Sequence, residues 1–432
     1  MPFEHIDTPR RRIAIIGGGI TGLSAAYHLA DAHDLVLYES EPRLGGHART
    51  LVAGKRGDQP VDTGFIVYNH VNYPGLVRMF EALDVPTAPS NMSFGASFGG
   101  GRCEYALHGL DAIFATRRHL ADPRFLRMIR DILRFNRDGL ALAQGTDMSI
   151  GDLLAALGTG RWFSERYLQP FSGAIWSTPT ARIMDFPAAA MMEFFRNHGL
   201  LGYRGQHQWH TVNGGSREYV SRLARNLTSR GVDLRPGAPV AGVRRTPMGV
   251  EVRAKGAEWD AFDEVIFATH SDQALKLLSD ATPSEAHALG AIRFQPNEAI
   301  LHRDPAVMPK RRTCWASWVY TERGPQDRER ISLSYWMNSL QPIPHDDPLF
   351  VTLNATTPVR EELIHDTYTF AHPQFDAAAL EAQKTLAALN GTAGAWFAGA
   401  WMRNGFHEDG FATAAEVAQT ILARATPAAA VA

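Results

Sequence analysis

The feature that most constrains the fold is a glycine-rich turn near the N-terminus. Residues 12–16 (RIAII) predict a short buried strand, and a G-x-G-x-x-G turn follows directly over 17–22. A helix over 21–30 and a second buried strand over 35–39 complete a βαβ unit. Because such a turn brings backbone amides and a helix N-terminus to a pyrophosphate, the unit predicts a bound dinucleotide.

Each glycine of the turn has a separate role. Gly17 permits the tight turn, Gly19 lets the backbone approach the pyrophosphate, and Gly22 lets the helix pack close to the strand. Glu39, at the end of the second strand, is placed to accept hydrogen bonds from a ribose. A second glycine pair follows at 45–46, and no other G-x-G-x-x-G begins a βαβ unit. These observations favour FAD over NAD(P).

Composition excludes several classes of function. The chain has 432 residues and a formal net charge of −2, so no overall positive charge favours nucleic acid. Cys103 and Cys314 lie far apart, which predicts neither a metal site nor a disulfide framework. A reducing compartment is therefore expected, and no stretch is long and apolar enough to cross a bilayer. We expect a cytoplasmic protein.

Secondary-structure patterns indicate two interleaved domains. Apolar residues at helical spacing predict helices over 73–83, 109–120, 123–143 and 187–198. Signals of the nucleotide-binding domain recur in three separated places, so this domain is expected to be discontinuous. The expected FAD-binding domain covers 1–71, 206–275 and 390–425. The expected substrate domain covers 72–205 and 276–389, with a helical part over 109–200, and 426–432 is expected to be a flexible tail.

A wider motif resembles a known superfamily. Arg43, the glycine pair and Thr50 form R-x-G-G-x-x-x-T, which is similar to the signature of the flavin amine oxidases and carotenoid desaturases. Residues 61–65 resemble the strand beneath the isoalloxazine, and 213–215 resemble a helix start that returns to the flavin domain. The resemblance implies an α/β fold. A Rossmann-type FAD-binding domain of the GR2 or amine-oxidase-like kind would be interleaved with a mixed α+β substrate domain.

The expected FAD contacts combine the fingerprint with the resemblance. They are Gly17, Gly19, Ile20, Thr21, Gly22, Glu39, Ser40, Arg43, Gly45, Gly46, His47, Gly64, Phe65, Val240, Gly399, Phe406, Glu408, Asp409 and Gly410. Two positions depart from the superfamily pattern. His47 stands where an arginine is usual, and Ala400 stands where an acid is common, so Glu408 or Asp409 is expected to replace that acid. No attachment point for the flavin stands out, so noncovalent FAD is expected.

Three segments resemble one bacterial branch of the superfamily more narrowly. They are residues 68–74, 91–94 and 405–410. This branch includes the flavin-dependent desaturase of bacterial furan fatty acid synthesis. The resemblance implies that the chain desaturates a methyl-branched or unsaturated fatty acyl chain of a phospholipid. Oxygen or a quinone is the expected electron acceptor, since no separate nicotinamide site is evident.

Histidines are the candidates for moving a proton during the reaction. His407 and His70 lead, followed by His198, because imidazole titrates near neutrality. An apolar substrate also requires an aromatic tunnel, although most large aromatic side chains are expected in the core. The candidates for the tunnel are Phe65, Phe94, Phe98, Phe171, Trp176, Phe194, Phe195, Trp315, Trp318 and Trp336.

Two other functions remain open alongside acyl desaturation. An amine oxidase of small amines would carry a lysine near the flavin, and the segment 297–303 (NEAILHR) has none. A flavin-bound protein without turnover could instead serve a lipid-modifying partner.

A basic segment over 117–137 bears on localisation. Seven arginines alternate there with apolar residues in a helical pattern. Such a helix either rests on the anionic inner face of the cell membrane or packs on the protein as a solvated helix. Both interpretations remain open.

Overall fold

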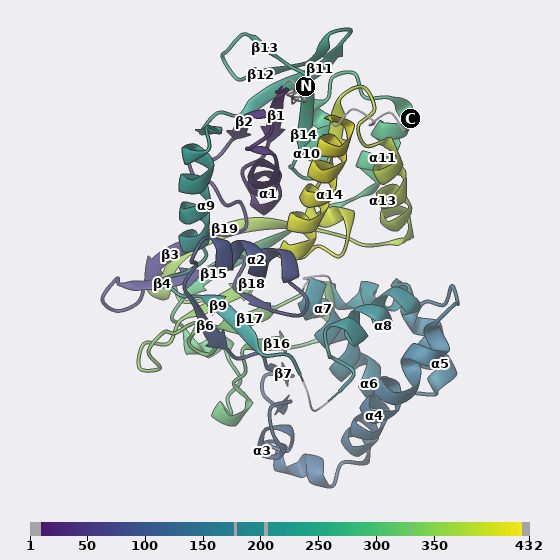
Figure 1. Cartoon of the computed structure of the whole chain (residues 1–432). Coiled ribbons are helices and arrows are strands. Elements are labelled where there is room, and N and C mark those ends of the chain that lie inside the picture. The colour runs from purple at the N-terminus through teal and green to yellow at the C-terminus, as the bar shows by residue number, and fades with distance from the viewer. Residues whose placement is uncertain (1–9, 177–178, 203–205, 330, 426–432) are drawn as a thin grey trace, which may run out of the picture.

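The computed structural model describes residues 10–176, 179–202, 206–329 and 331–425. The expected tail at 426–432 lies outside these residues. Two large sheets and a helical lobe make up the molecule (Figure 1). The α/β fold class is confirmed, since a parallel sheet alternates with helices along the chain and a mixed second sheet accompanies it.

The first sheet has five parallel strands in the order β10-β2-β1-β14-β20. Its strands are β1 (Arg12–Ile16), β2 (Asp34–Glu39), β10 (Asp233–Pro236), β14 (Glu264–Phe267) and β20 (Ala395–Phe397). Both faces of this sheet are covered, which explains the continuous apolar run of β1. Three separated parts of the chain therefore build one sheet, as the recurring nucleotide-domain signals suggested.

Helices cover one face of the parallel sheet. Ile13 and Ile15 pack there among α1 (Ile20–Leu29), α9 (Arg217–Ser229), α2 (Pro74–Ala82) and α14 (His407–Ala425). In Figure 1, α14 lies alongside α1.

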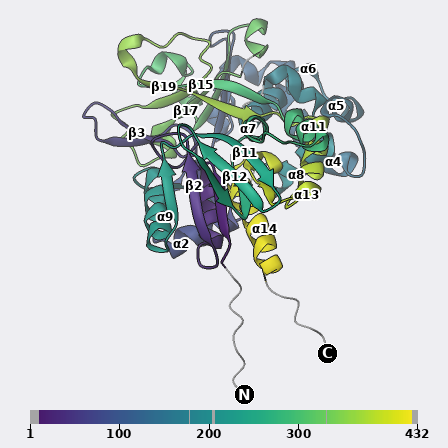
Figure 2. The ribbon, with the colours of Figure 1, turned by 90° about the horizontal axis from the view of Figure 1, so that it is seen from above.

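Ala14 and Ile16 point to the opposite face, against a small antiparallel sheet and three helices. These elements are β11 (Val240–Thr246), β12 (Gly249–Ala254), β13 (Trp259–Phe262), α10 (Ser271–Leu277), α11 (Pro283–Ala291) and α13 (Ala377–Leu389). The view from above shows β11 and β12 beside β2 (Figure 2).

The second large sheet has seven strands in the order β19-β15-β18-β17-β16-β7-β8, antiparallel except for the β16–β7 pair. Its strands are β7 (Phe94–Phe98), β8 (Cys103–Ala106), β15 (Phe294–His302), β16 (Trp318–Glu322), β17 (Leu333–Trp336), β18 (Phe350–Leu353) and β19 (Ile364–Pro373). The short helix α12 (Met337–Leu340) follows β17.

Two small sheets join the large ones. One pairs β3 (Thr50–Ala53) with β4 (Gln59–Asp62). The other places β9 (Trp209–Val212) between β5 (Val67–Asn69) and β6 (Thr87–Ser90). Strands β5 and β6 precede the helices of residues 110–197, and β9 follows them. Their pairing in one sheet therefore holds the two ends of the helical segment close together.

In Figure 1 the helical lobe lies below the parallel sheet and beside the seven-stranded sheet. It contains α3 (Leu110–Ile113), α4 (Pro123–Ala143), α5 (Ile150–Leu157), α6 (Arg161–Phe163), α7 (Gln169–Trp176) and α8 (Ala188–Asn197). Asp122 caps α4 by accepting a hydrogen bond from the Arg124 amide at 3.0 Å. Among the described residues, no helix has the length and apolarity needed to cross a membrane.

The expectation of one helix over 109–120 is wrong. The structure has α3 and then a 3₁₀ turn over Arg117–Leu120, separated at Thr116, whose backbone is extended. The Thr116 hydroxyl donates to the Glu104 carbonyl and accepts from the Glu104 amide, so pairing with β8 replaces helical hydrogen bonds. The strands β6, β7 and β8 lie between the helices expected over 73–83 and 109–120.

Candidate functional site

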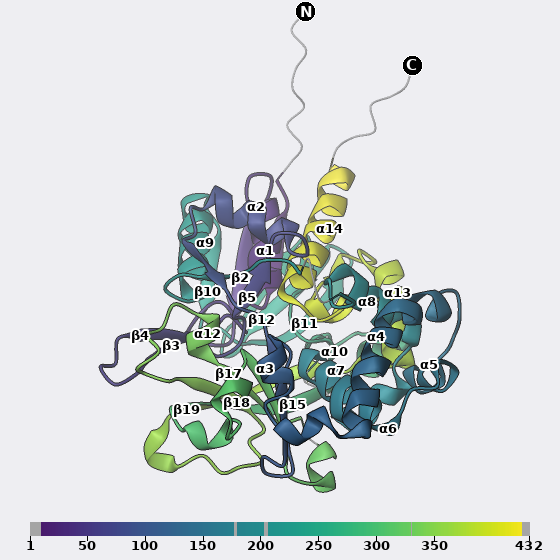
Figure 3. The same cartoon turned by 90° about the horizontal axis from the view of Figure 1, so that it is seen from below.

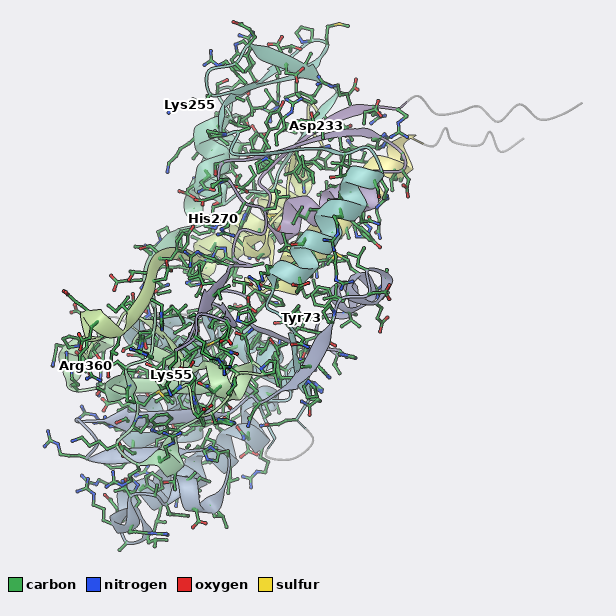
Figure 4. The ribbon with its side chains drawn as sticks, turned by 90° about the vertical axis from the view of Figure 1, so that its left-hand side faces the viewer. Lys55, Tyr73, Asp233, Lys255, His270 and Arg360 are labelled. Atoms are coloured by element: carbon green, nitrogen blue, oxygen red, sulfur yellow. The ribbon has the colours of Figure 1, made fainter. Side chains whose placement is uncertain are left out.

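A cavity of about 600 Å³ lies between the parallel sheet and the seven-stranded sheet. The carboxyl ends of β1, β2 and β14 open into it, which is where parallel sheets bind ligands. Strands β17, β18 and β19 supply other walls. Among the lining residues, His270 and Tyr73 are labelled in Figure 4, in the middle of the molecule.

Two glycine loops form one end of the cavity. The Gly45 amide donates to the Gly18 carbonyl at 2.8 Å, which ties the second loop to the first. A Cβ on Gly46 would lie 3.1 Å from the Gly19 Cα, so the close approach of the loops requires glycine at position 46. A Cβ on Gly22 would lie 1.9 Å from the Gly17 carbonyl oxygen. The turn is therefore bare of side chains where a pyrophosphate is expected.

Glu39 fixes the end of β2 beside these loops. One carboxylate oxygen accepts from the Gly18 amide at 2.6 Å, and the other accepts from the Glu41 amide at 2.8 Å. Glu39, Ser40 and Val240 all line the cavity, as expected for contacts to a ribose and adenine. Arg43 lies outside the lining and instead donates to the Gly46 carbonyl at 3.0 Å and the Ala48 carbonyl. It supports the loop from behind.

The opposite wall is built around Phe65 and His407. Their rings stack with centroids 3.9 Å apart and planes at 10°. His407 Nε2 lies 2.7 Å from the Tyr219 hydroxyl oxygen. Burial lowers the pKa of His407 to about 3, so the imidazole is neutral at physiological pH. A Cβ on Gly64 would lie 2.1 Å from the His47 carbonyl oxygen, so the adjacent strand also requires glycine.

Three further imidazoles lie together on the cavity wall. The ring centroid of His47 is 6.0 Å from that of His270 and 5.8 Å from that of His372. Burial is the main cause that lowers the pKa of all three, and that of His372 falls to about 4. Sequence reasoning missed His270 and His372. The position of His270, just after β14 at the carboxyl end of a parallel strand, was the available signal.

Replacing His372 by glutamine is expected to make stability less sensitive to acid. Between pH 6.5 and about 4 the unfolded chain binds a proton at this histidine and the folded chain does not, so the folded state loses stability as the pH falls. Wild type should lose about 1 to 3 kcal/mol more than His372→Gln across this window. Urea unfolding at several pH values measures this difference. The control His287→Gln, at an exposed position, should follow wild type, and equal slopes for all three proteins would contradict the prediction.

The end of the cavity away from the glycine loops is apolar. Its walls include Met92, Ile175, Trp176, Trp209, Trp318, Tyr335, Leu353 and Phe370. Of the aromatic residues proposed for a tunnel, Phe65, Trp176 and Trp318 line the cavity, whereas Phe98, Phe195 and others are core residues. Among the described lining residues Glu39 is the only acid, and it lies at the nucleotide end.

Several expected site residues lie elsewhere, which corrects their proposed roles. His70 is exposed, outside the cavity lining, and its ring centroid is 4.5 Å from that of His210. His198 is half-buried behind Phe406, with Nδ1 2.9 Å from the Phe194 carbonyl oxygen. Neither can touch a ligand in the cavity without rearrangement.

The carboxylates of Glu408 and Asp409 accept hydrogen bonds from backbone amides. Glu408 accepts hydrogen bonds from the Gly75 and Leu76 amides at 2.7 and 2.9 Å, because the N-terminus of α2 has unpaired donors. Asp409 accepts from the Phe406 amide at 2.9 Å. Gly410 lets α14 pack against α1, since a Cβ there would lie 2.7 Å from the Thr21 hydroxyl. These residues hold α14 in place and do not line the cavity.

The sequence profile of the family described as flavin containing amine oxidoreductase matches residues 20–342. The chain belongs to this family. Membership implies an FAD-type flavin cofactor, and the residues of the cavity fit one. The bare glycine loops, the helix N-terminus of α1 and Glu39 suit the dinucleotide, and the segment of Gly64 and Phe65 between β4 and β5 suits a flat ring.

Curated relatives match parts of the chain. Human protoporphyrinogen oxidase is 26% identical over 314 residues, which are 65% of this chain and 64% of that protein. Maize zeta-carotene desaturase is 44% identical over 79 residues, 18% of this chain and 13% of that protein. The chain thus spans less than two thirds of the length of these relatives.

Solved structures share the fold over nearly the whole chain. The fatty acid isomerase from P. acnes, described as producing CLA, has a TM-score of 0.68 at 15% identity and covers 95% of this chain and 98% of its own. Cyclohexylamine oxidase from Brevibacterium oxydans has a TM-score of 0.68 at 14% identity, covering 96% and 99%. At these identities the likeness shows the fold alone.

Proposed function

We propose that this flavoprotein dehydrogenates a methyl-branched or unsaturated fatty acyl chain of a phospholipid, with FAD held noncovalently. The observation that carries the proposal is the apolar wall away from the glycine loops. Within the described lining this wall bears no carboxylate, so it suits a hydrocarbon chain and leaves an ammonium ion without a counterion. Cys103 and Cys314 are buried outside the lining, which supports noncovalent FAD.

The reaction removes two hydrogens from adjacent carbons to form a double bond. When bound, the flavin supplies the acceptor for a hydride, and the remaining proton leaves to a base or to solvent. The apolar walls exclude water and hold the chain over the ring. His407 lines the cavity and is the proposed proton acceptor at Nδ1, which is free when Nε2–H donates to the Tyr219 hydroxyl. Burial lowers the pKa of His407 to about 3 and makes it a weak base, so solvent is the alternative acceptor in this proposal. Oxygen or a quinone is the proposed electron acceptor.

The names of similar proteins include enzymes of both apolar and amine substrates. A fatty acid isomerase shares the fold, and a carotene desaturase matches part of the sequence. Cyclohexylamine oxidase and putrescine oxidase share the fold equally well. The lining residues decide between them in our proposal: the only lysine in the described lining is Lys276, which pairs with Asp272 at 3.2 Å beside α10.

An anaerobic flavin spectrum tests this function. The purified holoprotein is mixed with detergent micelles of phospholipid that carries methyl-branched unsaturated acyl chains. Bleaching of the oxidised flavin band, with recovered lipid that has lost two hydrogen atoms, supports the proposal. Bleaching only by simple amines would overturn it in favour of an amine oxidase. A flavin that neither class reduces would overturn it in favour of a flavin-bound partner protein without turnover.

A carboxylate placed in the apolar wall is expected to impair acyl turnover. Ile175 is half-buried on α7 and lines the cavity. Ile175→Glu should lower kcat/KM for the acyl lipid at least about tenfold, because a charge must be desolvated when the chain binds. The matched control is Val77→Glu, at a half-buried position on α2 outside the cavity. Equal kcat/KM values for the two variants, both retaining flavin, would contradict an apolar substrate at this wall.

A further inference from the structure

Exposed leucines concentrate on one part of the helical lobe. Of the eight large hydrophobic side chains that are exposed among the described residues, five lie between residues 110 and 142. They are Leu110, Leu120, Leu126, Leu133 and Leu142. Single exposed leucines need no explanation, but their gathering on one segment marks an interaction surface.

Helix α4 presents two of these leucines in a stripe with arginines. Leu126, Arg130, Leu133 and Arg137 follow at intervals of four, three and four residues, which places them on one face of the helix. Met128 and Phe135 on the opposite face are fully buried in the lobe. Leu126 and Leu133 are 43% and 53% exposed, and the side chains of Arg130 and Arg137 are 71% and 75% exposed.

The same segment has a strong excess of positive charge. Residues 117–137 contain seven arginines and two aspartates. Asp131 is buried, where it accepts from the Gly160 amide at 2.7 Å and lies 3.6 Å from the guanidinium groups of both Arg127 and Arg130. Asp122 caps α4 and pairs with Arg124. Asp138, one residue past this segment, pairs with Arg137 at 2.7 Å. Residues 117–138 thus hold seven arginines against three aspartates, and the exposed face combines this excess of positive charge with leucines.

This face lies at one end of the molecule. In Figure 1, α3 and α4 lie at the lower end, away from the parallel sheet, and the view from below looks onto them (Figure 3). We call the surface formed by Leu110, Leu120, Leu126, Leu133, Arg130 and Arg137 the basic leucine face.

We propose that the basic leucine face docks on an anionic lipid bilayer. Leucines can enter the boundary between headgroups and acyl chains while long arginine side chains reach back to the phosphates. Anionic lipid complements the charge of the face and accommodates leucines scattered among arginines. This proposal deepens the proposed function, since it would bring the protein to its acyl chains, but it rests on surface observations alone. Vesicle binding tests the docking without any turnover, and the flavin spectrum tests turnover with micelles and no bilayer. Either proposal can therefore fail while the other holds.

Vesicle sedimentation of the holoprotein tests the docking. Vesicles of phosphatidylcholine with about one-third phosphatidylglycerol should bind the protein at least about tenfold more tightly than pure phosphatidylcholine at 0.1 M salt. Raising the salt to about 0.5 M should weaken binding several-fold, because screening shortens the reach of the arginines. Equal binding to both vesicle types, or none to either, would overturn the proposal.

Paired variants locate the surface. Leu126→Ser with Leu133→Ser, and separately Arg130→Gln with Arg137→Gln, should each weaken binding to the anionic vesicles at least about fivefold. The first control is Val52→Ser with Met248→Ser, at hydrophobic positions 50% and 91% exposed elsewhere. The second is Arg56→Gln with Arg225→Gln, at exposed positions outside the lobe. Flavin absorbance and circular dichroism check that each variant is folded. If the double serine variant does not fold, binding by the double glutamine variant alone tests the proposal. Wild-type binding by the arginine pair, or an equal loss in its control, would overturn the proposal.

Discussion

Replacing Gly19 by valine is expected to abolish FAD binding while the apoprotein stays folded. Gly19 has an extended backbone, with φ −75° and ψ −174°, so a side chain causes no conformational strain. The nearest atom to a Cβ at this position would be the Gly46 Cα at 3.9 Å. The valine would therefore meet little protein and would instead fill the space between the two glycine loops, where the backbone must approach a pyrophosphate.

The expected effect is a rise in the FAD dissociation constant of about 100-fold or more, since several amide contacts to the phosphates are lost together. Apoprotein stability should fall by only about 1 kcal/mol, because valine is a poor residue to begin a helix. Quenching of flavin fluorescence measures the affinity, and thermal unfolding of the apoprotein measures the stability. Gly22→Ala gives the contrast, since its Cβ would lie 1.9 Å from the Gly17 carbonyl oxygen and should disrupt the turn itself. Retention of FAD by Gly19→Val would place the dinucleotide elsewhere.

Replacing Asp62 by alanine is expected to destabilise the whole molecule. The buried carboxylate of Asp62 accepts hydrogen bonds from the Thr50 hydroxyl at 2.6 Å and from the Ser216 amide and hydroxyl at 2.8 and 2.6 Å. It also accepts from the Gln341 side chain at 2.9 Å. One side chain thus joins the β3–β4 hairpin, the start of α9 and the segment after α12.

Asp62→Ala leaves these donors buried without an acceptor and should lower the free energy of unfolding by about 3 kcal/mol or more. Chemical denaturation of the holoprotein measures the loss. Asp58→Ala on the same hairpin is the control, because Asp58 forms an exposed pair with Arg56 and should change stability by about 0.5 kcal/mol or less. A small effect at Asp62, comparable with that at Asp58, would show that the three segments are held together by other contacts.

The sequence was most informative where the fold depends on local pattern. A buried strand, a glycine turn and a helix follow one another within thirty residues, and their geometry depends on residues close together in the chain. The structure accordingly places Gly17, Gly19, Glu39 and Gly45 around one cavity. The helix expected over 123–143 is also present as α4, because its apolar spacing is long and regular.

Contacts between distant segments explain what the sequence did not predict. The proposed helix over 109–120 is interrupted because Thr116 bonds to Glu104 on β8, a contact that no helical pattern reveals. Glu408 and Asp409 were expected at the cofactor because they are acids near a flavin segment, but the amides of α2 and of Phe406 are closer partners.

By itself, then, the sequence determined the nucleotide-binding unit and the class of cofactor, since those depend on spacing along the chain. Only the tertiary structure decided which side chains share the cavity. It brought His270 and His372 beside His47, because β14 of the parallel sheet and β19 of the seven-stranded sheet both end at the cavity wall. It left His70 exposed and outside the cavity. It also showed that the arginines and leucines of α4 face outward together, because the buried face of that helix is set by Met128 and Phe135 packing in the lobe.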